Sequence, residues 1–139
     1  MKYILSLLLI LLLALPLICW GGALMSKDAA LTLAFPDADS IETATLFMTK
    51  EEMAQVKRRS GVIRDSAIYK FDVGKKDGEI TGYAAIEAAT GRTLPETVMV
   101  VLNADGTVRL AEILAFFEPS EYMPSKRWLN QFLGTKLSP

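Results

Sequence analysis

The first 25 residues constrain this chain more than any other stretch, because they are almost wholly apolar. The positive charge of Lys2 is followed by an apolar run from Tyr3 to Met25. A positive start, an apolar stretch and small residues at its end are typical of a secretory signal. We therefore expect residues 1–25 to be a signal peptide or membrane anchor and residues 26–139 to form one folded domain.

Three fates of the N-terminal segment fit the sequence. A signal peptidase could cut after Ala23, because Gly21 and Ala23 are the small residues that such a site requires. The run also has the roughly 20 residues that span a bilayer, so it could stay as an anchor. Cys19 could carry a lipid, although Ile18 stands where lipoprotein signals have a small residue. All three predict a periplasmic or other extracytoplasmic domain.

Composition excludes several classes of chemistry. The 139 residues contain no histidine, which excludes a Ser-His-Asp triad, His-ligated zinc and His-ligated haem. The single cysteine, Cys19, cannot form an internal disulfide or a Cys-x-x-Cys pair. Fifteen basic and sixteen acidic residues leave a formal charge of −1, whereas nucleic-acid binders carry a basic excess. We therefore expect no nucleic-acid partner and a domain stabilised by its hydrophobic core alone.

The first half of the domain predicts two helices separated by an extended segment. Residues 26–35 favour a short helix that ends before the next proline. Residues 41–48 are rich in threonine and favour a strand. Thr49 and Glu52 have the spacing of a capping box, which predicts a second helix that Gly61 ends.

In the second half the apolar period changes to two, which is typical of β-strands. Strands are predicted at residues 69–73, 79–88, 97–102 and 107–117. In the first of them, the apolar face carries Tyr69, Phe71 and Val73, and the polar face carries Lys70 and Asp72. Turn sequences separate the strands, and the third strand is apolar on both faces, as in the middle of a sheet. Consecutive strands with helices before and after predict an α+β domain with a small antiparallel sheet of about four strands and flanking helices.

A closing helix is predicted after Ser125, whose hydroxyl can cap it. Four apolar side chains fall on one face of this helix: Trp128, Leu129, Phe132 and Leu133. At this spacing Trp128 and Phe132 could stack on an aromatic ligand, but packing in the core is the commoner role.

Acidic residues give little indication of catalysis. Glu118 and Glu121 are three apart, which suits a general acid and base, but Pro119 favours a loop in which both acids are solvated. Three aspartates lie in or beside predicted turns, where this residue is common: Asp72, Asp77 and Asp105. The sequence has no EF-hand pattern and no phosphate-binding glycine motif, so we expect no metal site and no nucleotide cradle.

Several ordered stretches carry a resemblance to a known family. Residues 97–114 contain Val-Leu-Asn-Ala-Asp-Gly, and residues 118–132 contain Glu-Pro-Ser-Glu-Tyr and Trp-Leu-Asn-Gln-Phe. Upstream stretches stand in matching order at residues 35–39, 46–52 and 82–83. Over roughly residues 33–137 the chain resembles the FMN-binding domain family. That family includes extracytoplasmic flavin subunits of the sodium-pumping NADH:quinone reductase and of the Rnf complex, and small exported proteins.

The resemblance implies an exported FMN-binding protein that takes part in electron transfer at the outer face of the cytoplasmic membrane. Its partners would be membrane-bound redox proteins, and the flavin would supply the chemistry, so a self-sufficient enzyme is not expected. In the family a flavin transferase joins FMN to a threonine of a Ser-Gly-Ala-Thr sequence that follows the closing helix. The 139 residues do not contain that sequence, and Thr90 in Ala-Ala-Thr-Gly-Arg is not assigned to the role. A truncated family member, or one that holds FMN without a bond, fits this departure.

In relatives the loop between the last strand and the closing helix lies against the flavin. The resemblance therefore implies these cofactor-binding residues: Glu118, Ser120, Glu121, Tyr122 and Trp128. A phosphate near two glutamates would need a cation such as Lys126 or Arg127. An alternative interpretation keeps the scaffold without a cofactor, as a domain that docks on a partner through aromatic side chains. Those side chains would be Phe116, Phe117, Tyr122 and Trp128.

Overall fold

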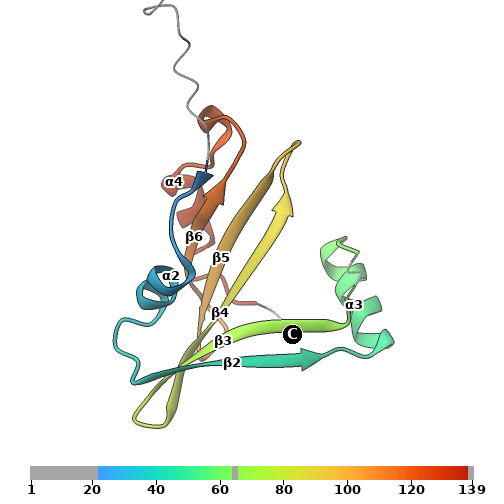
Figure 1. Ribbon diagram of the computed structural model, residues 1–139. Helices are drawn as coiled ribbons and strands as arrows, with labels where there is room; N and C mark the ends of the chain where they lie inside the picture. The colour runs from blue at the N-terminus through green and yellow to red at the C-terminus, as the bar shows by residue number, and fades with distance from the viewer. Residues whose placement is uncertain (1–21, 64–65, 138–139) are drawn as a thin grey trace, which may run out of the picture.

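A computed structural model describes residues 22–63 and 66–137 and shows an antiparallel sheet of six strands with helices on both faces (Figure 1). The strands are β1 Gly22–Ala23, β2 Ser40–Phe47, β3 Ile68–Lys76, β4 Glu79–Thr90, β5 Pro95–Asn103 and β6 Val108–Phe116. The helices are α2 Lys27–Ala34, α3 Lys50–Ser60 and α4 Lys126–Leu129, with the 3-10 turns η1 Ser120–Tyr122 and η2 Asn130–Phe132. The strand order is β1-β6-β5-β4-β3-β2.

The predicted α+β class and antiparallel pairing are confirmed, but the sheet has six strands and not about four. The additional strands form its two edges. β2 is the predicted extended segment, and it pairs with β3 from Ser40 to Phe47. β1 comes from the N-terminal segment, and Gly22 pairs with Phe116 of β6. Periodicity could not assign either strand to the sheet, because β1 has only two residues and the side chains of β2 are mostly exposed.

Most of the predicted export segment lies outside the described residues, Cys19 included. Within residues 22–63 and 66–137, no helix is long and apolar enough to cross a membrane. The end of the segment nevertheless belongs to the folded domain. After β1, the backbone amides of Leu24 and Met25 both donate to the carbonyl of Leu114.

The expected caps begin and end the first two helices. The Ser26 hydroxyl accepts a hydrogen bond from the Ala29 amide at 3.2 Å and caps α2. In the capping box of α3, the Thr49 hydroxyl accepts from the Glu52 amide, and the Glu52 carboxylate accepts from the Thr49 amide at 2.7 Å. Gly61 then ends α3 with a φ of 71°, a left-handed conformation that favours glycine.

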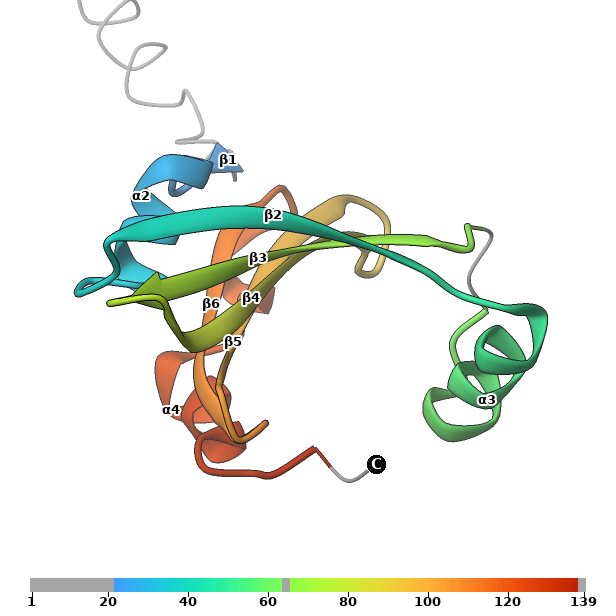
Figure 2. The same ribbon diagram turned by 90° about the horizontal axis from the view of Figure 1, so that it is seen from below.

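The two faces of the sheet are covered unequally (Figure 2). α2 packs on one face and forms the main core, which contains Ala30, Ala34, Phe35, Ala84, Met99, Val101 and Leu114. On the opposite face α4 covers β6 only, where Leu129 packs against Ile113 and Phe116. α3 stands at the far side of that face and buries none of its own residues. The middle of the second face is therefore left open.

The closing helix is shorter and less buried than predicted. Ser125 caps it as expected, but α4 has only four residues and continues as η2. Of the four side chains predicted to share a buried face, Leu129 is buried, and three are exposed: Trp128, Phe132 and Leu133. The prediction was wrong because one regular helix would align these positions, whereas the change from α to 3-10 geometry turns them apart.

Asp72 does not lie in a turn. It is inside β3, is 4% exposed, and accepts a hydrogen bond from the Thr43 hydroxyl at 2.6 Å. Lys27 of α2 pairs with its carboxylate at 3.2 Å, which ties the helix to β2 and β3. Periodicity placed Asp72 on the polar side of the strand, but that side faces α2. The other two aspartates, Asp77 and Asp105, do lie in turns as predicted.

Candidate functional site

Glu118 holds the loop that joins β4 and β5. Its side chain is 5% exposed, and its carboxylate accepts hydrogen bonds from the backbone amides of Arg92 at 3.1 Å, Thr93 and Leu94 at 2.7 Å. The amides of Thr93 and Leu94 are the main reasons that the pKa of Glu118 lies below its ordinary value, since they favour the charged form. The expectation of a solvated loop acid was therefore wrong, because Glu118 is an enclosed anchor.

A second contact joins the β4–β5 loop to the loop that follows β6, which contains Glu118. Ser120, Glu121 and Tyr122 form η1, directly after the loop of Glu118. The guanidinium of Arg92 lies 4.3 Å from the centre of the Tyr122 ring, a cation–π contact. Arg92 thus donates its backbone amide to Glu118 and stacks its side chain on Tyr122. The structure brings Glu118 and Tyr122 together around this arginine.

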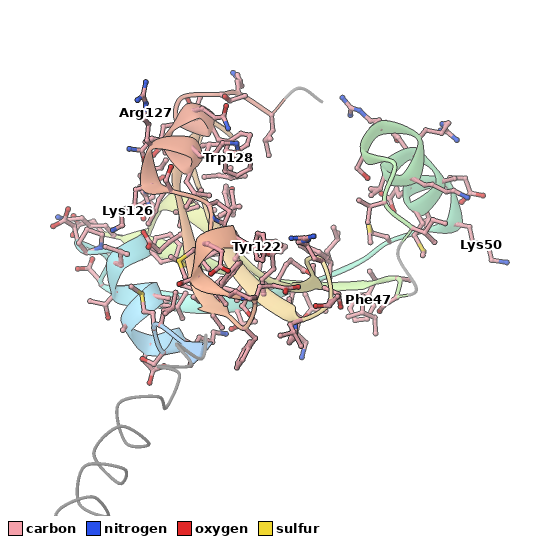
Figure 3. The ribbon with its side chains drawn as sticks, turned by 90° about the horizontal axis from the view of Figure 1, so that it is seen from above. Phe47, Lys50, Tyr122, Lys126, Arg127 and Trp128 are labelled. Carbon is pink, nitrogen blue, oxygen red and sulfur yellow. The ribbon has the colours of Figure 1, made fainter. Side chains whose placement is uncertain are left out.

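Trp128, the remaining residue expected to contact a flavin, is on α4 and separate from Tyr122 (Figure 3). Its ring packs edge-on against Phe132, with 5.2 Å between ring centres. Lys126, a cation expected near the phosphate, pairs with Glu112 at 3.9 Å. Arg127 points away from Tyr122, toward solvent (Figure 3). Of the residues expected from the resemblance, Glu118 and Tyr122 thus lie together around Arg92, whereas Trp128 lies apart from Tyr122.

An apolar groove of about 400 Å³ lies on the open middle of the second face. Three aromatic side chains line it, from adjacent strands: Tyr69, Phe71 and Tyr83. Phe71 and Tyr83 pack edge-on with 6.1 Å between ring centres. Leu46, Val100 and Leu102 are among the aliphatic residues that line the rest. The volume and the apolar lining are typical of small-molecule sites, which occupy about 300–1,000 Å³.

A second hollow of about 460 Å³ adjoins the groove on the side of α3. The two hollows share Leu46 and Leu137. The second hollow is mainly apolar, but Gln55, Arg59 and Glu52 of α3 add polar side chains to its lining. The Glu52 carboxylate is held by the Thr49 amide, and this bond is the main cause that lowers the pKa of Glu52. The combined depression is apolar over the strands, and the polar side chains of its lining gather beside α3, in what we call its polar part.

The last described residues close one side of the groove. Val108 donates its amide to the carbonyl of Thr135 at 2.9 Å, and Leu137 donates to Gly106 at 3.1 Å. Lys136 forms an antiparallel bridge with Thr107. These bonds run along the turn between β5 and β6, and they place Leu137 against both hollows.

The apolar alternation of residues 69–73 did not indicate this groove. It did predict that Tyr69 and Phe71 share one face of β3, and they do. It took that face to be the packed side of the strand, whereas both side chains are half-buried and line the open groove. A useful signal was available: aromatic residues on neighbouring strands face one side, and α3 has too little apolar surface to cover them.

A third hollow of about 490 Å³ lies at the end of α2. Arg109 lines it and donates to the carbonyl of Ala34 at 2.6 Å and to that of Thr81 at 3.3 Å. Its guanidinium also lies 5.6 Å from the ring centre of Phe35. Arg109 therefore satisfies a carbonyl at the C-terminus of α2, which is a structural role.

Within residues 22–63 and 66–137, no three acidic, cysteine or histidine side chains gather in a way that could hold a metal ion. No family model, curated protein or solved structure matches this chain.

Proposed function

We propose that this protein is an exported electron-transfer domain that binds FMN in the groove, at the outer face of the cytoplasmic membrane. The observation that carries the proposal is that the depression has an aromatic-lined part and, next to it, a part to which α3 contributes polar side chains. The isoalloxazine ring of FMN needs an apolar or aromatic wall, and its phosphate needs donors and positive charge. Tyr69, Phe71 and Tyr83 would contact the ring, and Gln55 and Arg59 would face the phosphate.

The side chains that line the polar part favour the binding of an anionic group. Arg59 lines it, and a guanidinium suits the planar, multidentate recognition of phosphate. Gln55 adds an amide donor from the preceding turn of α3. Glu52 is the acidic group in this lining, and its charge is engaged by the Thr49 amide at the helix N-terminus. Repulsion of a phosphate by this glutamate is therefore reduced.

In this proposal FMN binds in the groove and not at the loop after β6, which contains Glu118. Both carboxylate oxygens of Glu118 are engaged within the chain, because Oε1 accepts from three backbone amides and Oε2 accepts from the Thr93 hydroxyl. Along β4, the groove at Tyr83 is seven residues from Thr90 at the loop, which corresponds to roughly 23 Å. The residues from Glu118 to Trp128 remain the alternative contact set that the resemblance implies, and the experiment below separates the two.

The flavin, when bound, would supply the electron-carrying chemistry. The contribution of the chain would be to bind and orient it. Apolar side chains such as Leu102 and Val100 exclude water from the floor of the site, and Tyr83 and Phe71 restrict the plane of a flat ring. The groove is open on its outer side, so a membrane-bound redox partner could approach a ligand held there.

Quenching of flavin fluorescence by the full chain tests the proposal. Phe71→Ala and Tyr83→Ala should each weaken binding of both FMN and riboflavin about tenfold, because an aromatic contact contributes about 0.5–1.5 kcal/mol beyond its area. Arg59→Ala should weaken FMN and leave riboflavin unchanged. Phe47→Ala is the matched control, because Phe47 is 70% exposed and is not among the residues that line the groove.

Two results would contradict the proposal that FMN binds in the groove. One is a chain that quenches neither flavin. The other is a loss of FMN binding in Tyr122→Ala and Trp128→Ala with no loss in Phe71→Ala and Tyr83→Ala, which would return the flavin to the loop of Glu118.

The intact mass of the protein from its native membrane or periplasmic fraction decides how the flavin is held. A mass above that of the chain by one FMN less water means that a flavin transferase has formed a phosphoester, and that the chain carries an attachment sequence. An unmodified mass means that FMN is held by contacts alone. The same measurement reports whether the chain begins at Leu24, as cleavage after Ala23 predicts.

A cofactor-free docking domain is the second candidate. The observation that favours it is the exposure of Trp128, 52%, in an edge-on pair with Phe132. Phe116 cannot take part as expected, since it is fully buried against Leu129, whereas Phe117, directly after β6, is exposed. In this role, Trp128 fluorescence would change with a protein partner and not with FMN.

A further inference from the structure

One end of the domain gathers the chain entry point and two loop tips. β1 runs antiparallel to β6, so the residue before Gly22 continues past Phe116 and leaves the sheet at the end where β6 stops. The loop between β4 and β5 ends at the same place, because the Phe117 amide donates to the carbonyl of Pro95. Figure 1 shows β1, the tip of the β4–β5 hairpin and the loop after β6 together at this end.

Large apolar side chains are exposed on both loop tips. Leu94 of the β4–β5 loop is 43% exposed, and Phe117 and Tyr122 of the loop after β6 are 43% and 50% exposed. Arg92 lies between them on the Tyr122 ring. We define Leu94, Phe117, Tyr122 and Arg92 as the entry surface.

The entry surface is held as one unit. Glu118 accepts hydrogen bonds from three consecutive amides of the β4–β5 loop and is itself buried. The buried position of this carboxylate removes one negative charge from the surface. Glu121 is the exposed acid of η1 and remains at its edge. Leu94 and Phe117 therefore present apolar area from a braced backbone rather than from independent loops.

We propose that the entry surface docks on the phospholipid bilayer that holds the apolar run of residues 3–21. The first argument is continuity, because that run enters the domain at Gly22, beside Phe116. The second is chemistry, because amphipathic aromatic rings and arginine are the side chains that favour the headgroup level of a membrane. Leu94 and Phe117 insert below the headgroups, while Tyr122 and Arg92 lie at the level of the phosphates.

Lipid is favoured over a protein partner at this place. A chain anchored by residues 3–21 holds the entry surface within a few residues of the bilayer at all times, so the membrane is present at a very high effective concentration. The proposal rests on the membrane location in the proposed function. It does not depend on FMN, because the groove is on the open face, away from these loop tips.

Site-specific fluorescence in vesicles tests this inference with the full chain. In a Cys19→Ser background, an environment-sensitive label is attached at Leu94→Cys, Phe117→Cys or Phe47→Cys. Phe47 is the control, because it is highly exposed at the end of β2 that adjoins α3. The proteins are reconstituted in vesicles of phosphatidylcholine and phosphatidylglycerol, with or without brominated acyl chains.

The expected result is at least twofold stronger bromolipid quenching of the labels at 94 and 117 than of the label at 47. Equal quenching at the three positions would overturn the proposal, and so would a chain that does not sediment with the vesicles. Labels that respond only to added membrane proteins, and not to brominated lipid, would assign the surface to a protein partner instead. FMN titration of the same samples reports on the groove separately, so that failure of one proposal is distinguishable from failure of the other.

Discussion

The two faces of this sheet are built from the same strands but are completed differently. On the face under α2, Met99 and Val101 of β5 are fully buried against the helix. On the opposite face, the neighbouring residues Val100 and Leu102 line a groove. Alternation along a strand assigns side chains to faces, but it does not say whether another element covers each face. The covered face stabilises the fold, and the open face is available for a ligand.

The largest expected difference between the faces is in core stability. Phe35→Ala removes a ring that is buried in the main core, and should lower the free energy of unfolding by about 3–5 kcal/mol. Val100→Ala, on the open face, should lower it by only about 1 kcal/mol, because the side chain is half-buried. Urea unfolding of both variants measures this contrast. Similar losses would mean that the groove is filled and packed in solution.

A smaller effect is expected at Gly74, which lies on the covered face. The ring of Phe35 occupies the position that a Cβ of residue 74 would take, so Gly74→Ala should cost about 1–3 kcal/mol through overpacking. Gly22→Ala is the matched control, because no atom lies within 4 Å of its would-be Cβ, and its effect should stay within about 0.5 kcal/mol. Thermal unfolding of the two variants compares them. An unchanged Gly74→Ala would show that Phe35 moves aside freely.

The smallest effect concerns two glutamates that differ in enclosure, Glu118 and Glu121. The pKa of Glu118 is lowered in the folded state, so its contribution is complete at neutral pH. That contribution is lost as the pH falls from about 4.3, the ordinary value, through the lower folded pKa. Glu118→Gln should therefore reduce the unfolding temperature at pH 7 and flatten its decrease in acid. Glu121→Gln should leave the acid dependence unchanged. Identical curves for wild type and Glu118→Gln would contradict the role of the three amides.

Local signals in the sequence predicted the elements of the fold well. The caps at Ser26 and Thr49 and the left-handed Gly61 were all identified, because each depends on residues within one turn of a helix. The edge strand β1 was not identified, since it pairs with β6 through backbone groups at the other end of the chain. Asp72 was misplaced for a related reason, because its partner Lys27 comes from a distant helix.

The candidate site could be predicted only in part. The alternation of Tyr69 and Phe71 placed both on one side of β3, and that side does line the groove. Whether the groove is open depends on where α3 and the end of the chain lie, and those positions are set by tertiary contacts such as that of Leu137 with Gly106. The environment of Glu118 could not be predicted. Its carboxylate is enclosed by backbone amides of another loop, and no periodic pattern in the sequence reveals such a contact.

The pairing of β1 with β6 also sets an order of events in time. During synthesis, Gly22 is made early, whereas its partner Phe116 is made when most of the domain already exists. The backbone of Ala23 can therefore join the sheet only after β6 has been made. Under the proposed cleavage after Ala23, the peptidase would compete with this last strand pairing for the same stretch of backbone.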